Sequence, residues 1–191
     1  MFSRRELLKA GAAAGLAAIV GSCGYYSNSL VQYPEIGFPL SDPRAVKTKE
    51  FAEYVIRSAN SHEYNPALRI YTIESNSKRQ RIAFGIVINN MVYSGIVTDV
   101  DDTDEPARNE EDLISINFWA LGSERHTVRL RDYGLNGACD YGFIPRGLAK
   151  DENGGDIVYD RRREVGLHHR HIFQQLYEQT LDTLIEAIQR R

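Results

Sequence analysis

The chain divides into segments in which the spacing of apolar residues differs. Residues 10–22 carry no charge, residues 43–59 repeat apolar positions every three or four residues, residues 68–131 mostly alternate, and residues 167–189 return to the longer period. A period near 3.6 is typical of an amphipathic helix, and alternation is typical of a strand with one buried face. The pattern therefore predicts two helices with several strands between them.

Both predicted helices have clear sequence signals. The first begins with Ser41 or Asp42 as N-cap and Pro43 at the first helical position, where a missing amide hydrogen does no harm. It ends within residues 60–66. The last helix is predicted over residues 167–189, and we expect its apolar stripe to pack on the domain's own sheet, with a partner-binding surface as the alternative.

The strands are predicted over residues 68–74, 81–88, 91–97, 113–121 and 126–131, with a further short strand over 156–159. Asn89-Asn90 lies between two of these runs, and asparagine tolerates the positive φ of a tight hairpin. Gly122-Ser123-Glu124 predicts a second hairpin in the same way. Residues 132–142 and 145–155 are predicted as irregular loops.

These elements predict an α+β fold for residues 41–191, in which one antiparallel sheet of about five strands is covered on one face by the N-terminal and C-terminal helices. Without its first 22 residues the chain has about 170 residues, which are enough for one domain with a core that needs no disulfide.

The first 22 residues have the layout of an export signal. Ser3-Arg4-Arg5-Glu6-Leu7-Leu8-Lys9 resembles the twin-arginine signal, with Leu7 where that family usually has Phe. The uncharged stretch after it has about 13 residues, which is shorter than the roughly 20 that cross a bilayer. The resemblance implies that residues 1–22 are removed, and that Arg4 and Arg5 are read by the twin-arginine translocase, which exports folded proteins.

A candidate lipid anchor follows directly. Val20-Gly21-Ser22-Cys23-Gly24 resembles a bacterial lipobox, in which small residues precede a cysteine whose sulfur receives the lipid. The resemblance implies a place in the cell envelope, on the extracytoplasmic side of a lipid membrane, periplasmic or surface-facing. Residues 23–40 are predicted as a tether, because the stretch after Cys23 is polar and is broken by Pro34, Gly37 and Pro39. Two alternatives stay open, because Cys23 could be incidental after an ordinary signal cleavage, or could form a disulfide with Cys139.

The net charge of the chain argues against one class of binding partner, nucleic acids. Removal of residues 1–22 takes away three of the 23 basic residues and one of the 26 acidic residues, which changes the formal net charge from -3 to -5. Binding to nucleic acid needs a clustered basic face, so we expect no nucleic-acid partner.

One loop resembles a calcium-binding loop of the EF-hand type. Asp132, Asn136 and Asp140 stand at three ligand positions, and Gly137 stands where the sharp turn is needed. Gly134 and Phe143 depart from the pattern, since one ligand position has no side-chain oxygen and the closing glutamate is missing. The alternative is a glycine-rich turn in which the Asp and Asn side chains accept hydrogen bonds from nearby amides. The turn is the preferred interpretation, and calcium, bound by Asp132, Asn136 and Asp140, is the candidate cofactor if the loop holds an ion.

Two further clusters could hold ions. One is an acidic run that could bind a cation or could simply be a solvated loop: Asp99, Asp101, Asp102, Asp104, Glu105, Glu110, Glu111 and Asp112. The other is His168, His169 and His171, for which a structural role is preferred over a transition-metal site.

The chain contains no Gly-x-Ser-x-Gly elbow, phosphate loop or dinucleotide fingerprint. We therefore expect a non-catalytic lipoprotein whose domain binds a ligand or an envelope protein beside the membrane. The alternative is a small metal-dependent extracytoplasmic enzyme.

Overall fold

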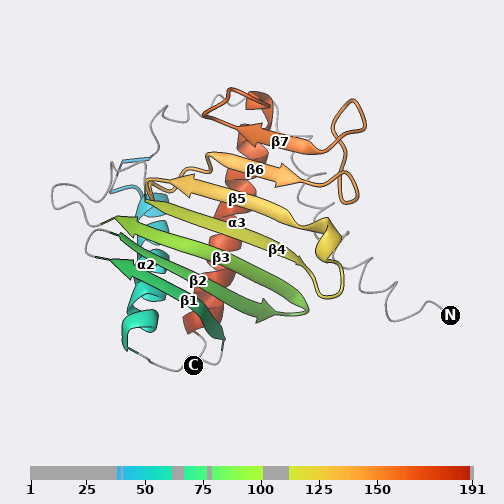
Figure 1. Ribbon diagram of the computed structural model, residues 1–191. Coiled ribbons are helices and arrows are strands. Elements are labelled where there is room, and N and C mark those ends of the chain that lie inside the picture. Colours follow the sequence, from blue (N-terminus) through green and yellow to red (C-terminus); the bar gives the residue numbers. More distant parts are fainter. Residues whose placement is uncertain (1–37, 40, 62–66, 77–78, 101–111, 190–191) are drawn as a thin grey trace.

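The computed structural model describes residues 38–39, 41–61, 67–76, 79–100 and 112–189. These residues form one antiparallel seven-stranded sheet in which each strand pairs with the next along the chain. The strands are β1 (Leu68–Asn76), β2 (Arg79–Ile88), β3 (Met91–Val100), β4 (Leu113–Ala120), β5 (Val128–Tyr133), β6 (Tyr141–Ile144) and β7 (Ile157–Asp160). Two helices, α2 (Pro43–Ser61) and α3 (Arg170–Gln189), lie behind the sheet in Figure 1, on the same face.

The predicted α+β class and single antiparallel sheet are confirmed, but the strand count of about five is wrong. The predicted loop over residues 132–142 ends inside a strand, because Tyr141–Ile144 forms β6 between β5 and β7. This strand has only four residues and contains Gly142, so its own sequence carries little strand signal. Its place depends on neighbouring strands that supply hydrogen bonds on both sides.

The ends of both helices follow local chemistry. Asp42 caps α2, since the amide of Arg44 donates to Asp42 Oδ1 at 2.9 Å, and the predicted start at Pro43 is confirmed. The last helix starts later than predicted, because Leu167–His169 form a 3₁₀ turn and α3 begins at Arg170. Of the described helices, none is long and apolar enough to cross a membrane.

The predicted hairpin at Asn89-Asn90 is confirmed, with φ of 47° and 66° at the two asparagines. The predicted hairpin between β4 and β5 is also confirmed, although the 3₁₀ turn Glu124–His126 lies between its strands.

The core lies between the sheet and the two helices. Every second residue of β5 is buried on the helix side, and Gly142 of β6 lies against the ring of Phe173 from α3. Phe173 also stacks on Tyr159, with 6.0 Å between ring centroids. The largest fully buried side chains are Tyr159, Tyr177, Phe51, Phe84, Phe173, Ile82, Ile86, Ile114, Ile116, Leu130, Ile144 and Leu184. The other face of the sheet carries no helix among the described residues (Figure 1).

Candidate functional site

The turn between β5 and β6 brings the three predicted calcium ligands together. Asp132 is at the end of β5, Asn136 is at the centre of the turn and Asp140 directly precedes β6. Asp132 and Asp140 are fully buried, and Asn136 is 7% exposed. Gly137 has a φ of +81°, which lets its amide point back toward β5.

The carboxylate of Asp132 accepts hydrogen bonds from three groups. The amides of Asn136 and Gly137 donate at 3.1 Å and 2.8 Å, and the hydroxyl of Tyr177 from α3 donates at 3.1 Å. Burial and the nearby Asp140 raise the pKa of Asp132 well above its usual range, while these three donors act in the opposite direction.

Asn136 and Asp140 also bond within the turn. Asn136 Oδ1 accepts from the amide of Ala138 at 3.1 Å, and Asp140 Oδ2 accepts from the amide of Tyr133 at 2.8 Å. Arg161 Nε lies 3.0 Å from Asp140 Oδ1, yet that oxygen has no aligned hydrogen-bond donor. Burial raises the pKa of Asp140 to about 6, despite the opposing effects of the Tyr133 amide and three nearby arginines. These are the contacts that a self-capped turn requires, and calcium binding stays a prediction.

Helix α3 holds the turn in place. Gln174 accepts a hydrogen bond from the amide of Cys139 at 2.8 Å and donates one to the carbonyl of Gly137 at 2.9 Å. Cys139 is a free, buried thiol that donates to the carbonyl of Tyr141 at 3.2 Å. Because backbone groups of the turn are bonded to a rigid helix, the turn is part of the core structure.

The other predicted clusters are placed only in part. Most of the acidic run lies outside the described residues, but Asp112 is buried and its carbonyl accepts from the amide of Gly134 at 2.8 Å. Asp112 therefore lies at the same end of the sheet as the calcium-like turn. His168 and His169 lie in the 3₁₀ turn with 3.8 Å between ring centroids, and burial followed by the charge of His168 lowers the pKa of His169. No group of three potential metal-ligating side chains was found within the described ranges.

Arg4, Arg5 and Cys23, predicted for export and lipid attachment, lie outside the described residues, as does nearly all of the tether. Phe38 is described, and it packs on the domain under the guanidinium of Arg44, which is 3.5 Å from its ring centroid. Its amide donates to the carbonyl of Asn136 at 3.2 Å. The described chain therefore enters the fold beside the turn that contains Asp132.

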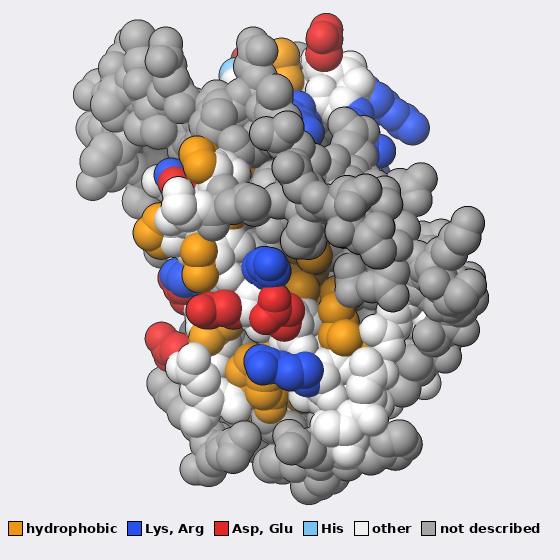
Figure 2. All heavy atoms as spheres, turned by 90° about the vertical axis from the view of Figure 1, so that its left-hand side faces the viewer, with side chains coloured by type: hydrophobic (Ala, Val, Ile, Leu, Met, Phe, Trp, Pro, Cys, Tyr) orange, Lys and Arg blue, Asp and Glu red, His pale blue; other side chains and the backbone are white. Residues whose placement is uncertain are grey.

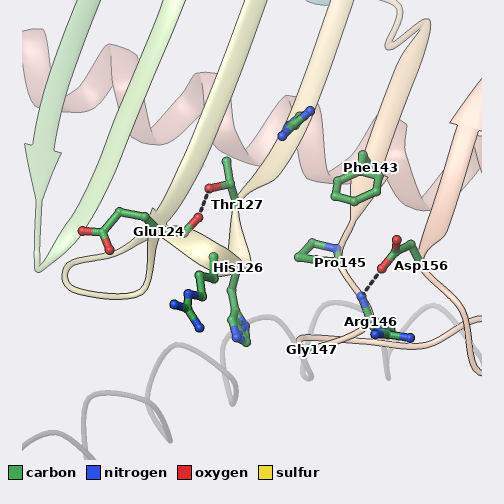
Figure 3. Close-up of a pocket in the computed structure, with 10 residues that line it drawn as sticks. Glu124, His126, Thr127, Phe143, Pro145, Arg146, Gly147 and Asp156 are labelled. Carbon is green, nitrogen blue, oxygen red and sulfur yellow. Dashed lines mark hydrogen bonds between the residues drawn. The ribbon is translucent and has the colours of Figure 1, made fainter.

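A groove of about 520 Å³ lies at the opposite end of the sheet. It is formed by the connection from β4 to β5 and by both ends of the connection from β6 to β7. Figure 3 shows Glu124, His126 and Thr127 on one side of it and Phe143, Arg146 and Asp156 on the other. The lining residues are Glu124, Arg125, His126, Thr127, Arg129, Phe143, Pro145, Arg146, Gly147 and Asp156.

Local contacts shape the walls of this groove. Thr127 Oγ1 donates to the carbonyl of Glu124, and Asp156 Oδ1 accepts from the amide of Arg146 at 2.6 Å. Gly147 lies so close to His126 that a Cβ atom there would be 2.6 Å from the imidazole Cε1. A side chain at position 147 would therefore require the imidazole of His126 to shift.

The groove has an excess of positive charge, because three arginines line it together with the two carboxylates of Glu124 and Asp156. Arg125, Arg129 and Arg146 are exposed, and none of them forms an ion pair with another residue of the described chain. Elsewhere acidic and basic side chains stand next to one another, as the side of the molecule in Figure 2 shows. On the helices, for example, Lys47 pairs with Asp182, and Arg44 pairs with Asp42 at 2.8 Å. Arginine carries five donors in a planar fork, so this groove can bind carboxylate or phosphate oxygens.

Sequence reasoning missed the groove. Its residues come from three segments that carry no ligand-type motif, and the arginines look like ordinary surface charge. A signal existed in the topology, because alternate connections of an antiparallel meander meet at one end of the sheet. That signal required β6, which the sequence did not predict.

Comparison with protein-family models finds no matching family. Searches of curated proteins and of solved structures find no significant match to this chain.

Proposed function

We propose that this protein is a lipid-anchored, extracytoplasmic binding domain, and that its ligand is an anion that occupies the groove. The observation that carries the second part is the set of three exposed arginines that lack carboxylate partners in the described chain. Like charges gathered in one concave site raise the local positive potential, and an anionic ligand removes the repulsion between them. The groove volume of about 520 Å³ is within the range of small-molecule sites.

The proposed lipid anchor and export route are supported by the sequence alone. The lipobox-like segment supports acylation of Cys23, and the paired Arg4 and Arg5 support export through the twin-arginine translocase. Changing Cys23 to Ser should release the protein from membranes without unfolding it, because acyl chains supply about 0.8 kcal/mol per buried methylene group. A Cys23→Ser protein that still sedimented with membranes would contradict the lipid anchor.

Phosphate titration of the Cys23→Ser protein tests the groove. Inorganic phosphate should raise the melting temperature relative to chloride at the same ionic strength, with a stabilisation of about 1.4 kcal/mol at a tenfold excess over Kd. The double variant Arg125→Ala, Arg146→Ala should lose this response. The matched control is Arg57→Ala, Arg69→Ala, which removes two exposed arginines far from the groove and should keep it. Equal responses in both double variants would refute the groove as the site.

The metal-dependent enzyme remains the rival hypothesis from the sequence. Metal analysis of the purified protein distinguishes the two, because a stoichiometric transition metal would favour the enzyme.

A further inference from the structure

The open face of β5 and β6 carries alternating arginine and aromatic side chains. Residues 128, 130 and 132 of β5 are buried on the helix side, so Arg129, Arg131 and Tyr133 point to the other face. Residues 142 and 144 of β6 are likewise buried, so Tyr141 and Phe143 share that open face. The strand register places Arg129 opposite Phe143 and Arg131 opposite Tyr141.

Each of these arginines lies over a ring. The guanidinium carbon of Arg129 is 5.5 Å from the ring centroid of Phe143, and that of Arg131 is 4.9 Å from the ring of Tyr141. At the far end of the same strip, Arg162 lies 3.7 Å from the ring of Tyr133. Neither Arg129 nor Arg131 forms an ion pair with a described residue, and one donor of Arg131, Nη1, is bonded to the hydroxyl of Tyr133 at 3.4 Å.

Stacking prepares a guanidinium to bind an anion. The aromatic ring covers one flat face of the group and restricts its rotamers, while the N–H donors in its plane remain directed sideways. Less conformational entropy is then lost when a carboxylate binds. The strip is continuous with the groove, because Arg129 and Phe143 belong to both.

The spacing of the arginines favours an extended peptide. Arg129 and Arg131 are two residues apart on one strand, which separates them by about 6.6 to 6.8 Å along the sheet. Alternate side chains of an extended peptide have the same separation, and a carboxylate matches the planar fork of arginine. We infer that this strip and the adjoining groove bind an extended acidic peptide segment with carboxylates on alternate residues. The inference rests on the proposed function, since it names the ligand class of the same groove.

The test compares two peptides with the same composition and charge. One is a blocked octapeptide of alternating Glu and Ser, and the other has its four Glu residues first and its four Ser residues last. The Cys23→Ser protein should bind the alternating peptide several-fold more tightly in calorimetric titrations at low salt. Arg131→Ala should weaken that binding roughly tenfold, which is about 1.4 kcal/mol, because a charge-assisted bidentate contact is lost. Arg131→Lys should also weaken it, because lysine lacks the planar fork, whereas Arg57→Ala should not.

Phosphate binding separates this inference from the groove proposal. Arg131 does not line the groove, so Arg131→Ala should leave the phosphate response unchanged. If phosphate binds but the two peptides bind equally, the peptide inference is wrong and the groove stands. If the alternating peptide binds through Arg131 while phosphate does not bind, peptide binding by the strip is supported and anion binding by the groove is refuted. If neither binds, both fail. A polyphosphate of equal charge that binds more tightly than the alternating peptide would overturn the assignment to a peptide.

Discussion

At the end of the sheet where β5 turns into β6, charged groups are buried and bonded, whereas at the opposite end they are exposed and lack ion-pair partners among the described residues. Asp132 and Asp140 lie under α3 and accept hydrogen bonds from amides of their own turn. Arg125, Arg129 and Arg146 line an open groove. The ligand-like residues of the turn accept hydrogen bonds from its own amides, whereas the groove is lined by residues that belong to no recognisable motif.

The largest expected effect concerns Asp132. Changing Asp132 to Ala leaves the amides of Asn136 and Gly137 without an acceptor in the core and leaves Thr48 Oγ1, at 3.3 Å, as the partner of the Tyr177 hydroxyl. The change should lower the free energy of unfolding by roughly 3 to 5 kcal/mol. Urea denaturation measures this value. The matched control is Arg131→Ala, one residue away on the open face, which should cost about 1 kcal/mol or less. Similar losses of unfolding free energy in Asp132→Ala and Arg131→Ala would show that the buried carboxylate contributes no more to stability than the arginine on the open face.

The next effect is a dependence of stability on pH. The pKa of Asp140 is about 6 in the folded protein and about 3.9 in an unfolded chain, so the folded state holds the proton more tightly. Protonation of Asp140 therefore contributes to the free energy of unfolding fully below about pH 4. This contribution, about 3 kcal/mol in total, is lost as the pH rises through about 6. Urea denaturation between pH 4 and 7 should show the wild type losing stability relative to Asp140→Asn. Parallel curves for the two proteins would contradict the raised pKa.

A smaller effect is expected from packing. A methyl group at Gly142 would overlap the ring of Phe173, so Gly142→Ala should cost about 2 kcal/mol. Combining it with Phe173→Leu should cost less than the two single changes together, because the smaller side chain leaves room.

Gly85→Ala is the control for this prediction on the open face. There the added Cβ would lie 2.6 Å from Cε2 of Tyr71, a side chain that is 65% exposed and free to move aside. Its cost should be close to zero. Thermal unfolding of the four variants tests the contrast, and a loss at Gly85 as large as that at Gly142 would argue against it.

The smallest expected effect is that of calcium. A self-capped turn already has amide donors on Asp132, Asn136 and Asp140, so calcium up to several millimolar should leave the melting temperature unchanged, as should magnesium. A rise with calcium alone that disappears in Asp140→Asn would instead establish the calcium-loop hypothesis. The range must reach several millimolar because weak extracellular sites have Kd values of about 10⁻⁴ to 10⁻³ M.

Sequence reasoning succeeded where structure depends on neighbours along the chain. The cap at Asp42 and the hairpin at Asn89-Asn90 are local, and both are confirmed. It failed for Tyr141–Ile144, since a four-residue strand with a central glycine is stabilised by its partners across the sheet. The groove could not be predicted for the same reason, because its walls come from segments that meet only when β6 is in place.

The burial of Cys139 makes its rate of labelling by a thiol reagent depend on local unfolding. The chain has two cysteines, so a Cys23→Ser protein has a single thiol, and that thiol is 1% exposed beneath α3 with a pKa raised mainly by burial. A thiol reagent can reach it only when the turn separates from the helix, so the labelling rate reports how often this end of the molecule opens. Cys139 is therefore a built-in probe for the rate of local unfolding at this end of the sheet. With it, opening at the buried end can be timed while a ligand is added at the groove.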